Sequence, residues 1–327
     1  MLGKLRVAKY RLTLEAVDTL RLPAFKGTTL RGGFGAVFRR TICAQRQIDN
    51  CRDCSLQTTC PYAYIFETPL PEGSEVLSLE QDIPRPFVLE PPLDRKRVYD
   101  PGEPIEFGLI LIGRAIKYLP YFIVVFRELG RVGLGAGRGR CYLREAVALE
   151  PFDGAEEVIY AASDDMLRTR DLGVGYPGIE AEARKLSAER VTLKFLTTTR
   201  IKHNGRFVSE PEFHVLVRAI LRRLSSLYYF HCGERWETDY RGMIDAAKQV
   251  RLAIDRTRWV HRNRYSRRQG QRMSLGGFVG EASYEGELET FLPLLLVGEL
   301  AHVGKACVFG NGRFRVSRLD DAPRWAI

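Results

Sequence analysis

The feature of this sequence that most constrains its fold is a segment that occurs twice, 173 positions apart. The copies are residues 119–143 and residues 292–316, and each reads as a Leu-Pro pair, an apolar run, a Gly-x-Gly-Arg motif and a strand. The aligned pairs are Pro120 and Pro293, Gly137 and Gly310, Gly139 and Gly312, and Arg140 and Arg313, with no gap. A repeat of this order indicates an internal duplication, so we predict two related domains.

The second copy predicts a helix that begins near Pro293, then a glycine-rich loop, then a strand. Proline suits the first helical turn, and the glycines at 304, 310 and 312 let the loop turn sharply and approach a ligand closely. Lys305 and Arg313 add positive charge beside the loop amides, which is the chemistry of a phosphate-contacting loop. The alternative is a helix, a long turn and an edge strand without a ligand.

The two halves of the chain also share one order of elements: strand, helix, strands, helix, glycine-rich loop, strand. In the second half, the helix that follows Glu212 has its apolar residues spaced for one face. This order is that of the ferredoxin-like fold, which RNA-recognition motifs share. We therefore predict an α+β chain with two tandem ferredoxin-like domains, residues 1–150 and 189–327, joined by a polar linker at residues 151–188.

The charge of the chain indicates a polyanionic partner. Lysine and arginine number 50 against 40 aspartate and glutamate residues, which makes a formal net charge of +10. Between Arg251 and Arg272 there are eight arginines and His261, with one acid, Asp255. Arginine forms bidentate contacts with phosphate and stacks on bases. Like charges at this density repel one another unless an anion neutralises them. We therefore predict that the segment binds nucleic acid, and we regard a solvated basic surface as the less favoured alternative.

The sequence shows neither a membrane span nor a secretion signal. The longest apolar runs are far shorter than a membrane span. The N-terminus, Met1 to Val7, lacks the apolar core of a signal peptide. We therefore expect a cytoplasmic protein with no membrane partner.

Four of the seven cysteines lie in one short insertion of the first domain, at about residues 43–60. Cys43, Cys51, Cys54 and Cys60 follow the spacing C-x7-C-x2-C-x5-C. Four thiolates so close together in a cytoplasmic protein are typical of a structural zinc site or, as a second choice, of an iron–sulfur cluster. The alternative is a loop of free thiols, because the first interval is not a standard zinc-finger spacing.

Several segments carry a resemblance to a known family. They are residues 276–288, 291–295, 302–305 and 309–313, with weaker likeness at residues 30–35, 195–200 and 264–267. In these segments the sequence resembles the pre-crRNA-processing endoribonucleases of CRISPR systems, which are members of the RAMP superfamily. The similarity is best over residues 190–318, and the duplicated architecture extends it to most of the chain.

This resemblance implies a repeat-specific, metal-independent endoribonuclease that needs no cofactor for catalysis. Such an enzyme binds CRISPR repeat RNA and cuts the pre-crRNA once in each repeat. A ribose 2′-hydroxyl attacks the adjacent phosphate, leaving a 2′,3′-cyclic phosphate and a 5′-hydroxyl. The implied partners are the repeat RNA, other CRISPR effector or adaptation subunits, and a second copy of the chain.

The catalytic residues are a separate question, because this sequence departs from the commoner pattern. Many relatives carry a catalytic histidine on or near the first helix, but residues 25–42 contain none. His302 borders the glycine-rich loop and is the first candidate for general acid or base, with Lys26 and Lys305 as cations that stabilise the transition state. The rival role for His302 is at a helix C-terminus, in contact with carbonyls.

The RNA contacts are predicted from the basic segments and the glycine-rich loops. His203 and His261 also lie on basic segments, either as alternative catalytic groups or as RNA contacts. The residues predicted to bind RNA are Arg31, Arg39, Arg138, Arg140, Arg262, Arg264, Arg267, Arg268, Gly304, Gly310, Gly312 and Arg313.

Two other functions compete with the endoribonuclease. One is a non-catalytic subunit that holds repeat RNA or crRNA in a CRISPR complex, and the missing first-helix histidine favours it. The other is a metal-organised module in which the cysteine cluster touches RNA. We favour the endoribonuclease.

Overall fold

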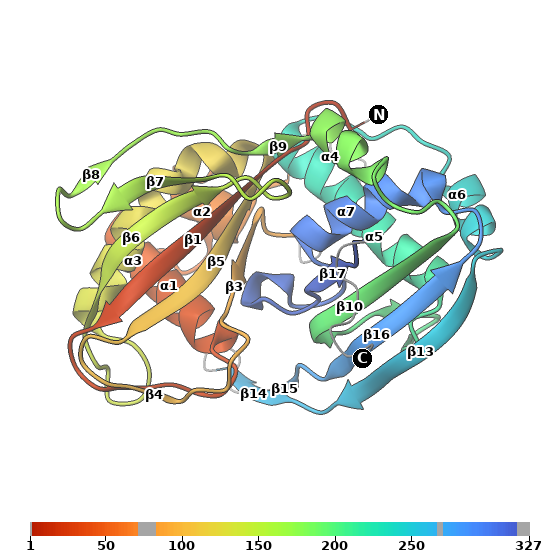
Figure 1. Ribbon diagram of the computed structural model, residues 1–327. Coiled ribbons are helices and arrows are strands. Elements are labelled where there is room, and N and C mark those ends of the chain that lie inside the picture. Colours follow the sequence, from red (N-terminus) through yellow and green to blue (C-terminus); the bar gives the residue numbers. More distant parts are fainter. Residues whose placement is uncertain (1, 71–82, 267–270, 319–327) are drawn as a thin grey trace. The chain divides into compact units, whose positions relative to one another are not determined.

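The computed structural model describes residues 2–70, 83–266 and 271–318, and its contacts divide the chain into two compact units (Figure 1). The N-terminal unit consists of Lys4–Val174 and Ser226–Arg235, and the C-terminal unit of Met1–Gly3, Gly175–Ser225 and Trp236–Ile327. The segment predicted as a linker, residues 151–188, is thus shared between the two units. Its first part belongs to the N-terminal unit because it adds strands to that unit's sheet.

The N-terminal unit is built on an antiparallel sheet with the strand order β3-β5-β1-β6-β7-β8. These strands are β1 (Arg6–Ala16), β3 (Phe87–Glu90), β5 (Pro104–Ile112), β6 (Cys141–Leu149), β7 (Glu156–Ala161) and β8 (Met166–Leu167). A small separate sheet pairs β2 (Leu20–Arg21) with β4 (Val98–Tyr99), and β9 (Val174–Gly175) pairs with β1. The order of β3, β5, β1 and β6 is that of a ferredoxin-like sheet, as predicted.

Two helices pack on this sheet through a cluster of aromatic rings. They are α1 (Gly27–Ile42) and α3 (Leu119–Val132), with the short helix α2 (Pro61–Phe66) beside α1. Phe34 of α1 stacks on Phe122 and Phe126 of α3, with ring centroids 4.9 Å and 4.7 Å apart. Each buried phenylalanine contributes roughly 1.5–3 kcal/mol of hydrophobic stabilisation. The cysteine-rich segment, with the 3-10 turn η1 (Cys51–Asp53), lies between α1 and α2.

A second segment of the chain completes the N-terminal unit. The π-helical turn η4 (Tyr228–Cys232) packs against the 3-10 helix η3 (Gly113–Tyr118). The His231 ring is fully buried, with Nε2 2.7 Å from the Pro84 carbonyl and Nδ1 3.2 Å from the Tyr64 hydroxyl. Arg114 donates to the Phe230 carbonyl at 2.8 Å. His231 is therefore part of the packing of this unit.

The C-terminal unit repeats the same architecture. Its antiparallel sheet has the order β13-β16-β10-β17, again that of a ferredoxin-like sheet. Its principal elements are β10 (Arg190–Thr199), α5 (Phe213–Leu227), β13 (Arg251–Val260), β16 (Gly277–Glu285), α7 (Leu292–Ala301) and β17 (Phe314–Val316). The shorter ones are α4 (Tyr176–Ala183), α6 (Tyr240–Ala247), the 3-10 turns η5 (Glu289–Phe291) and η6 (Cys307–Phe309), and the hairpins β11 (Lys202–His203) with β12 (Arg206–Phe207) and β14 (Asn263–Ser266) with β15 (Gln271–Ser274).

Helices α5 and α7 cover one face of this sheet (Figure 1). Phe213 of α5 packs on Tyr284 of β16, with ring centroids 5.1 Å apart, and on Phe291 at 5.2 Å. Gly298 of α7 lies so close to Ile220 and Phe314 that an added Cβ would sit 3.0 Å from each. Apolar residues recur about every 3.6 residues on the helices and every 2 residues on the strands. Each element therefore has one apolar face, and these faces pack together in the core.

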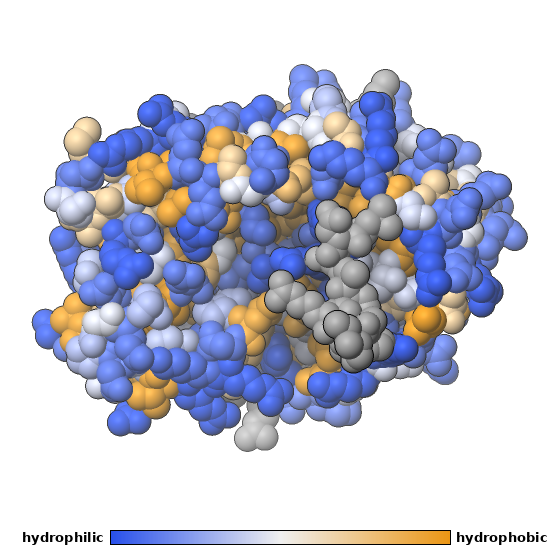
Figure 2. Space-filling model, viewed as in Figure 1, coloured by the Kyte–Doolittle hydropathy of each residue, from blue (hydrophilic) through white to orange (hydrophobic). Residues whose placement is uncertain are grey.

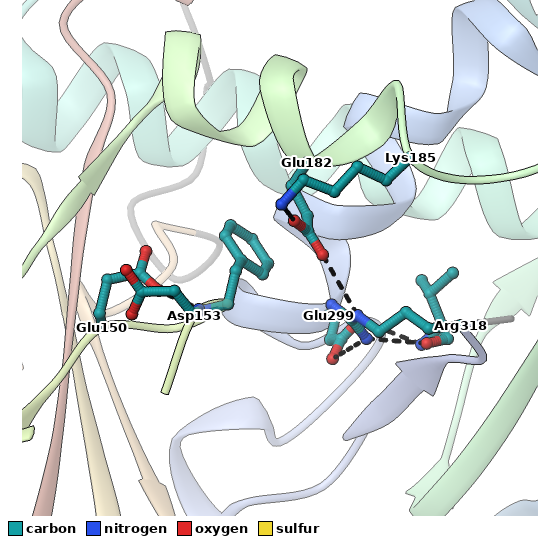
Figure 3. Close-up of polar contacts among 8 residues, drawn as sticks. Glu150, Asp153, Glu182, Lys185, Glu299 and Arg318 are labelled. Carbon is teal, nitrogen blue, oxygen red and sulfur yellow. Dashed lines mark hydrogen bonds and ion pairs between the residues drawn. The ribbon is translucent and has the colours of Figure 1, made fainter. Parts of the chain in front are cut away.

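An ion-pair network ties α4 and α7 to the end of β17 (Figure 3). The Arg318 guanidinium lies 3.4 Å from carboxylate oxygens of both Glu182 and Glu299. Lys185 pairs with Glu182 at 2.8 Å, and the Val316 amide donates to Glu299 at 3.0 Å. These contacts hold the short strand β17 in place next to β10.

Figure 2 shows one face of the surface coloured by hydropathy. The face seen in Figure 2 is mainly hydrophilic, and its hydrophobic residues form small separate groups. Within the described residues, no helix combines the length and the apolar character that crossing a membrane requires.

Candidate nucleic-acid interface

The glycine-rich loop of the C-terminal unit, residues 302–313, is fastened to the end of β10 by hydrogen bonds. The Thr197 hydroxyl donates to the Gly310 carbonyl at 2.7 Å and accepts from the Arg313 amide at 2.9 Å. The Gly312 amide donates to the Thr198 carbonyl at 3.0 Å. The loop is therefore built against the run of threonines that ends β10.

This arrangement changes the role of two predicted phosphate-binding glycines. The amides of Gly310 and Gly312 both donate to backbone carbonyls, and both residues are buried. Gly312 has φ +71°, and an added Cβ would collide with the Val303 carbonyl oxygen. The glycine allows another group to approach its Cα closely, as predicted, but that group is the backbone of Val303 and not a ligand. In this structure Gly310 and Gly312 shape the loop and do not present amides to a phosphate.

His302, the first catalytic candidate, lies inside the protein. Its side chain is 1% exposed, and Nδ1 lies 3.0 Å from the Asn311 carbonyl oxygen. The residue follows the last residue of α7 and has φ +61°. In this structure His302 closes the helix end and joins it to the loop, as its rival role predicted, and a catalytic role for His302 stays a prediction without support from this arrangement.

Lys26, the second catalytic candidate, is also buried. Its side chain is 0% exposed, and Nζ pairs with the Asp94 carboxylate at 2.9 Å and lies 5.7 Å from the centroid of the Tyr99 ring. The ammonium group thus has an internal counter-ion in the N-terminal unit. In this structure Lys26 is part of the packing at the start of α1, and a catalytic role for Lys26 stays a prediction without support from this arrangement.

Lys305, the third candidate, has an exposed side chain at the end of the C-terminal sheet. Its amide donates to the Arg200 carbonyl at 2.9 Å. The Arg200 guanidinium lies 3.7 Å from the centroid of the Phe207 ring and donates to the Ser274 carbonyl. Phe207 is itself 42% exposed. An arginine over an exposed aromatic ring, next to a lysine, provides positive charge for phosphate and an aromatic surface for a base.

A two-residue hairpin extends this basic end. Strands β11 and β12 pair Lys202 with Phe207 and His203 with Arg206. The turn between them, Asn204-Gly205, has φ angles of +47° and +81°, as a type I′ hairpin turn requires. Lys202 and Arg206 have exposed side chains. We call Arg200, Lys202, Arg206, Phe207 and Lys305 the basic end of the sheet.

The open face of the sheet carries more positive charge. Strand register places Arg256 opposite Glu281 and Arg258 opposite Val279, on the face turned away from α5 and α7. Arg315 lies opposite Lys194 on the same face, and Lys194 pairs with Glu281 at 3.4 Å. Within the described part of the chain, Arg256, Arg258 and Arg315 are exposed and form no ion pair. Arg315 points outwards because its neighbours Phe314 and Val316 are buried in the core.

The predicted RNA contacts of the N-terminal unit have partners of their own. The Arg31 guanidinium lies 4.9 Å from the centroid of the Phe66 ring, and Arg39 donates to the Ile48 carbonyl at 2.7 Å. Arg140 makes an ion pair of 2.9 Å with Asp18. Hydrogen bonds from the side chain and the backbone amide of Arg140 lower the pKa of the Asp18 carboxyl to about 2. Arg138 is exposed in the loop and has φ +50°.

The remaining predicted contacts lie in the C-terminal unit. Arg262 is half-buried, and its carbonyl accepts from the Leu275 amide at 2.7 Å. The backbone of Arg264 pairs with Met273 in the β14–β15 hairpin. Arg313 is half-buried in the loop, and Gly304 has φ +89° next to the Arg200 backbone. Arg267 and Arg268 lie outside the described residues.

The four clustered cysteines are free thiols, each half-buried. Cys51 and Cys60 pack against the hydrophobic core of the N-terminal unit, and burial raises the pKa of the Cys51 thiol. Within the described ranges, no three His, Cys, Asp or Glu side chains are arranged to hold a metal ion. Zinc or iron–sulfur binding by Cys43, Cys51, Cys54 and Cys60 stays a prediction, without support from this arrangement.

Sequence reasoning named Lys305, but it did not name Phe207 or the open-face residues Arg256, Arg258 and Arg315 as candidate contacts. Arg256 and Arg258 lie within the basic run that was recognised, but their outward direction follows from strand register. The hairpin had a signal that could have located it, since Asn204-Gly205 is the commonest type of two-residue hairpin turn.

Two family models match this chain. Residues 193–314 match the CRISPR-associated endoribonuclease Cas6, and residues 5–172 match a family described as an N-terminal domain. An uncharacterized protein of Archaeoglobus fulgidus is 27% identical over 300 residues, which cover 90% of this chain and 92% of that protein.

The fold is similar to that of solved Cas6 structures. A product complex of Thermus thermophilus Cas6 has a TM-score of 0.59 at 15% identity, over 95% of this chain and 100% of that chain. Another structure of Thermus thermophilus Cas6 has a TM-score of 0.55 at 14% identity, over 96% and 99%. A partial Cas6-RT-Cas1–Cas2 complex has a TM-score of 0.57 at 11% identity, over 97% of this chain and 47% of that chain. At these identities the likeness shows the shared fold.

Proposed function

Because residues 193–314 match the model of the CRISPR-associated Cas6 endoribonucleases and the fold is similar to that of solved Cas6 structures, we propose that this chain binds CRISPR repeat RNA and cuts it without a metal ion. The observation that carries the proposal is a group of exposed cations on the open face and at the basic end of the C-terminal sheet. Arg256, Arg258 and Arg315 on the open face and Lys305 at the basic end form no ion pair within the described residues. Such cations are the electrostatic footprint of a phosphate backbone.

The proposed reaction is attack of a ribose 2′-hydroxyl on the adjacent phosphorus. The new P–O2′ bond forms while the P–O5′ bond breaks, which leaves a 2′,3′-cyclic phosphate and a 5′-hydroxyl. A base must accept the 2′-hydroxyl proton, the leaving oxygen must gain a proton, and cations must stabilise the charge on the phosphorane. Arg200 and Lys305 are placed to supply positive charge, and Phe207 offers a ring on which a base can stack.

The test uses 5′-labelled RNA containing a repeat from the host's own CRISPR array, incubated with purified protein in EDTA. We expect one cut in each repeat, with a product that migrates as a cyclic phosphate and shifts after acid opening. A matched substrate with a single 2′-deoxynucleotide at the cut position should bind equally and stay intact. Cutting of that deoxy substrate, or cutting that requires added Mg²⁺, would contradict the proposed mechanism.

A second candidate function is supported by the burial of His302 and Lys26. Two of the three groups predicted to perform the chemistry are not accessible, which favours a subunit that holds crRNA without cutting it. This role predicts tight, salt-sensitive binding of the repeat and an intact RNA after prolonged incubation. The same labelled RNA distinguishes the two functions. Association with other CRISPR effector or adaptation subunits, and homodimerisation, stay predictions.

A further inference from the structure

Burial divides the five histidines, all of which lie in the described residues, into two groups. His231 and His302 are 0% and 1% exposed and are part of the packing. His203, His214 and His261 have exposed surface. A group that exchanges a proton with RNA must be reached by the RNA, so only the second group can act on a substrate.

Two of the accessible histidines touch each other. The rings of His203 and His214 meet edge to face, with centroids 5.7 Å apart and an interplanar angle of 83°. His214 also contacts a carboxylate: its Nδ1 lies 3.4 Å from a Glu212 carboxylate oxygen. His261 has an aromatic neighbour, with the centroid of the Trp259 ring 6.4 Å away. His214 thus contacts both Glu212, which precedes α5, and His203 in the β11–β12 hairpin.

The fold gives a reason for this contact between residues eleven positions apart. The tight turn at Asn204-Gly205 sends the chain back, and the Val208 amide donates to the Ile201 carbonyl at 3.1 Å. The chain then enters α5 at Phe213, so the first turn of α5 lies beside the hairpin. His203 is fixed between two cationic neighbours on the hairpin, Lys202 and its cross-strand partner Arg206.

From this geometry, and resting on the proposed RNA cleavage, we propose that His203 is the catalytic base and that His214, held by Glu212, is its positioning residue. The neutral imidazole of His203 accepts the proton of the 2′-hydroxyl as that oxygen bonds to phosphorus. The P–O5′ bond breaks, and the 5′-oxygen takes a proton from water. The His203 imidazolium returns its proton to solvent afterwards. Lys202, Arg206 and Arg200 stabilise the charge on the phosphorane.

The surroundings of His214 suit a positioning role. Burial lowers the pKa of His214, and the positive charges of Arg218 and Lys248 and the neighbouring His203 lower it as well, while Glu212 raises it. The lowered pKa favours the neutral form of His214, which does not repel the positive charge that develops on His203. Because a general base acts in its neutral form, the cleavage rate should decrease at low pH, where the base becomes protonated.

The experiment measures single-turnover cleavage of the repeat RNA in EDTA, with protein in excess, for the wild type, His203→Ala, His214→Asn and His261→Ala. His203→Ala should cut at least about 100-fold more slowly, the scale of general base catalysis, with its RNA affinity changed less than about threefold. Added imidazole should restore part of the rate in His203→Ala, which a structural role would not allow. His214→Asn should shift the acid limb of the pH–rate profile. Added imidazole should raise its cleavage rate less than it raises that of His203→Ala.

Each outcome decides a separate point. If the wild type cuts and His203→Ala cuts at the same rate, the inference about His203 is overturned while the proposed endoribonuclease stands. If His261→Ala loses cutting and His203→Ala keeps it, the base lies elsewhere and the inference is again overturned. If the wild type binds but never cuts, both the enzyme and its base are overturned together.

Discussion

The glycine-rich loops of the two units close in the same way. In the N-terminal unit the Leu134 amide donates to the Gly139 carbonyl at 2.9 Å. In the C-terminal unit the Val303 amide donates to the carbonyl of the aligned Gly312 at 3.0 Å. Helix α3 ends at Val132 whereas α7 ends at Ala301, so the second loop begins earlier relative to the repeat and is the longer one. The duplication thus preserved the closing hydrogen bond while the loop before it changed length.

The two loops differ in what lies opposite their shared arginine. The amide of Arg140 donates to the Asp18 carboxylate at 3.0 Å, and the amide of Arg313 donates to the Thr197 hydroxyl at 2.9 Å. Asp18 also binds the Arg140 side chain and neutralises its charge. Thr197 makes the same kind of backbone contact without a negative charge. In both units the amide of the shared arginine therefore has a side-chain oxygen as its acceptor. A carboxylate acceptor adds a negative charge there, whereas a hydroxyl acceptor does not.

The same contrast extends over both sheets. In the N-terminal unit, Arg11 pairs with Glu156 at 2.6 Å and Arg144 with Glu15 at 3.4 Å. In the C-terminal unit, Arg256 and Arg258 have no such partner within the described residues. These strands thus differ in charge pairing: Arg11 and Arg144 are paired internally, whereas Arg256 and Arg258 are available to an external anion. Other cations of the C-terminal sheet, such as Arg251, are paired. We infer that Arg256 and Arg258 are the ones that meet RNA.

The largest expected effect breaks the shared loop closure. Gly312→Ala should destabilise the C-terminal unit by at least about 4 kcal/mol, because φ is +71° and the new Cβ collides with the Val303 carbonyl. The matched variant Gly139→Ala should cost less, about 1–3 kcal/mol, since its Cβ meets a movable Leu20 methyl at 2.7 Å and a Thr19 carbonyl oxygen at 2.8 Å. Calorimetry, which resolves unfolding of separate units, measures both. Equal losses would contradict this account.

The next effect tests the difference in charge. Replacing both Arg256 and Arg258 by Ala should weaken binding of repeat RNA about tenfold and reduce the slope of log affinity against log salt concentration by about 2. The matched double variant Arg11→Ala with Arg144→Ala removes two cations that are already paired, so its affinity should change less than about threefold. Filter binding between 50 and 300 mM salt, roughly the range in which such slopes are resolved, measures both. Identical losses in the two variants would remove the distinction between the two sheets.

The smallest effect concerns Asp18. Its folded-state pKa lies at about 2, below the ordinary aspartate value, because Arg140 donates to it. A depressed carboxyl pKa stabilises the fold above the unfolded-state pKa, and that contribution is lost as pH falls through the folded-state pKa. At pH 6 the wild type should therefore have a slightly higher unfolding temperature than Asp18→Asn. The two unfolding temperatures should converge as the pH approaches about 2. A difference that stays constant with pH would show that the ion pair contributes nothing.

The sequence by itself determined the architecture of this protein. The repeat at an interval of 173 residues, the prolines that begin α3 and α7, and the apolar faces of α3 and α5 are local patterns. They predicted two ferredoxin-like domains, which the structure confirms. Local patterns suffice here because helix and strand periods decide which face of each element is apolar, and burying those faces leaves few arrangements.

The tertiary structure alone decided which polar residues face solvent. His302 and Lys26 have the same side chains as catalytic residues do, yet one is buried against Asn311 and the other against Asp94. His203 meets His214 because a hairpin folds back onto the start of α5, and Arg256 faces outwards because of its register with β16. Burial, pairing and register depend on contacts between segments distant in sequence, and a pattern read along the chain carries no information about them until the sheets have formed.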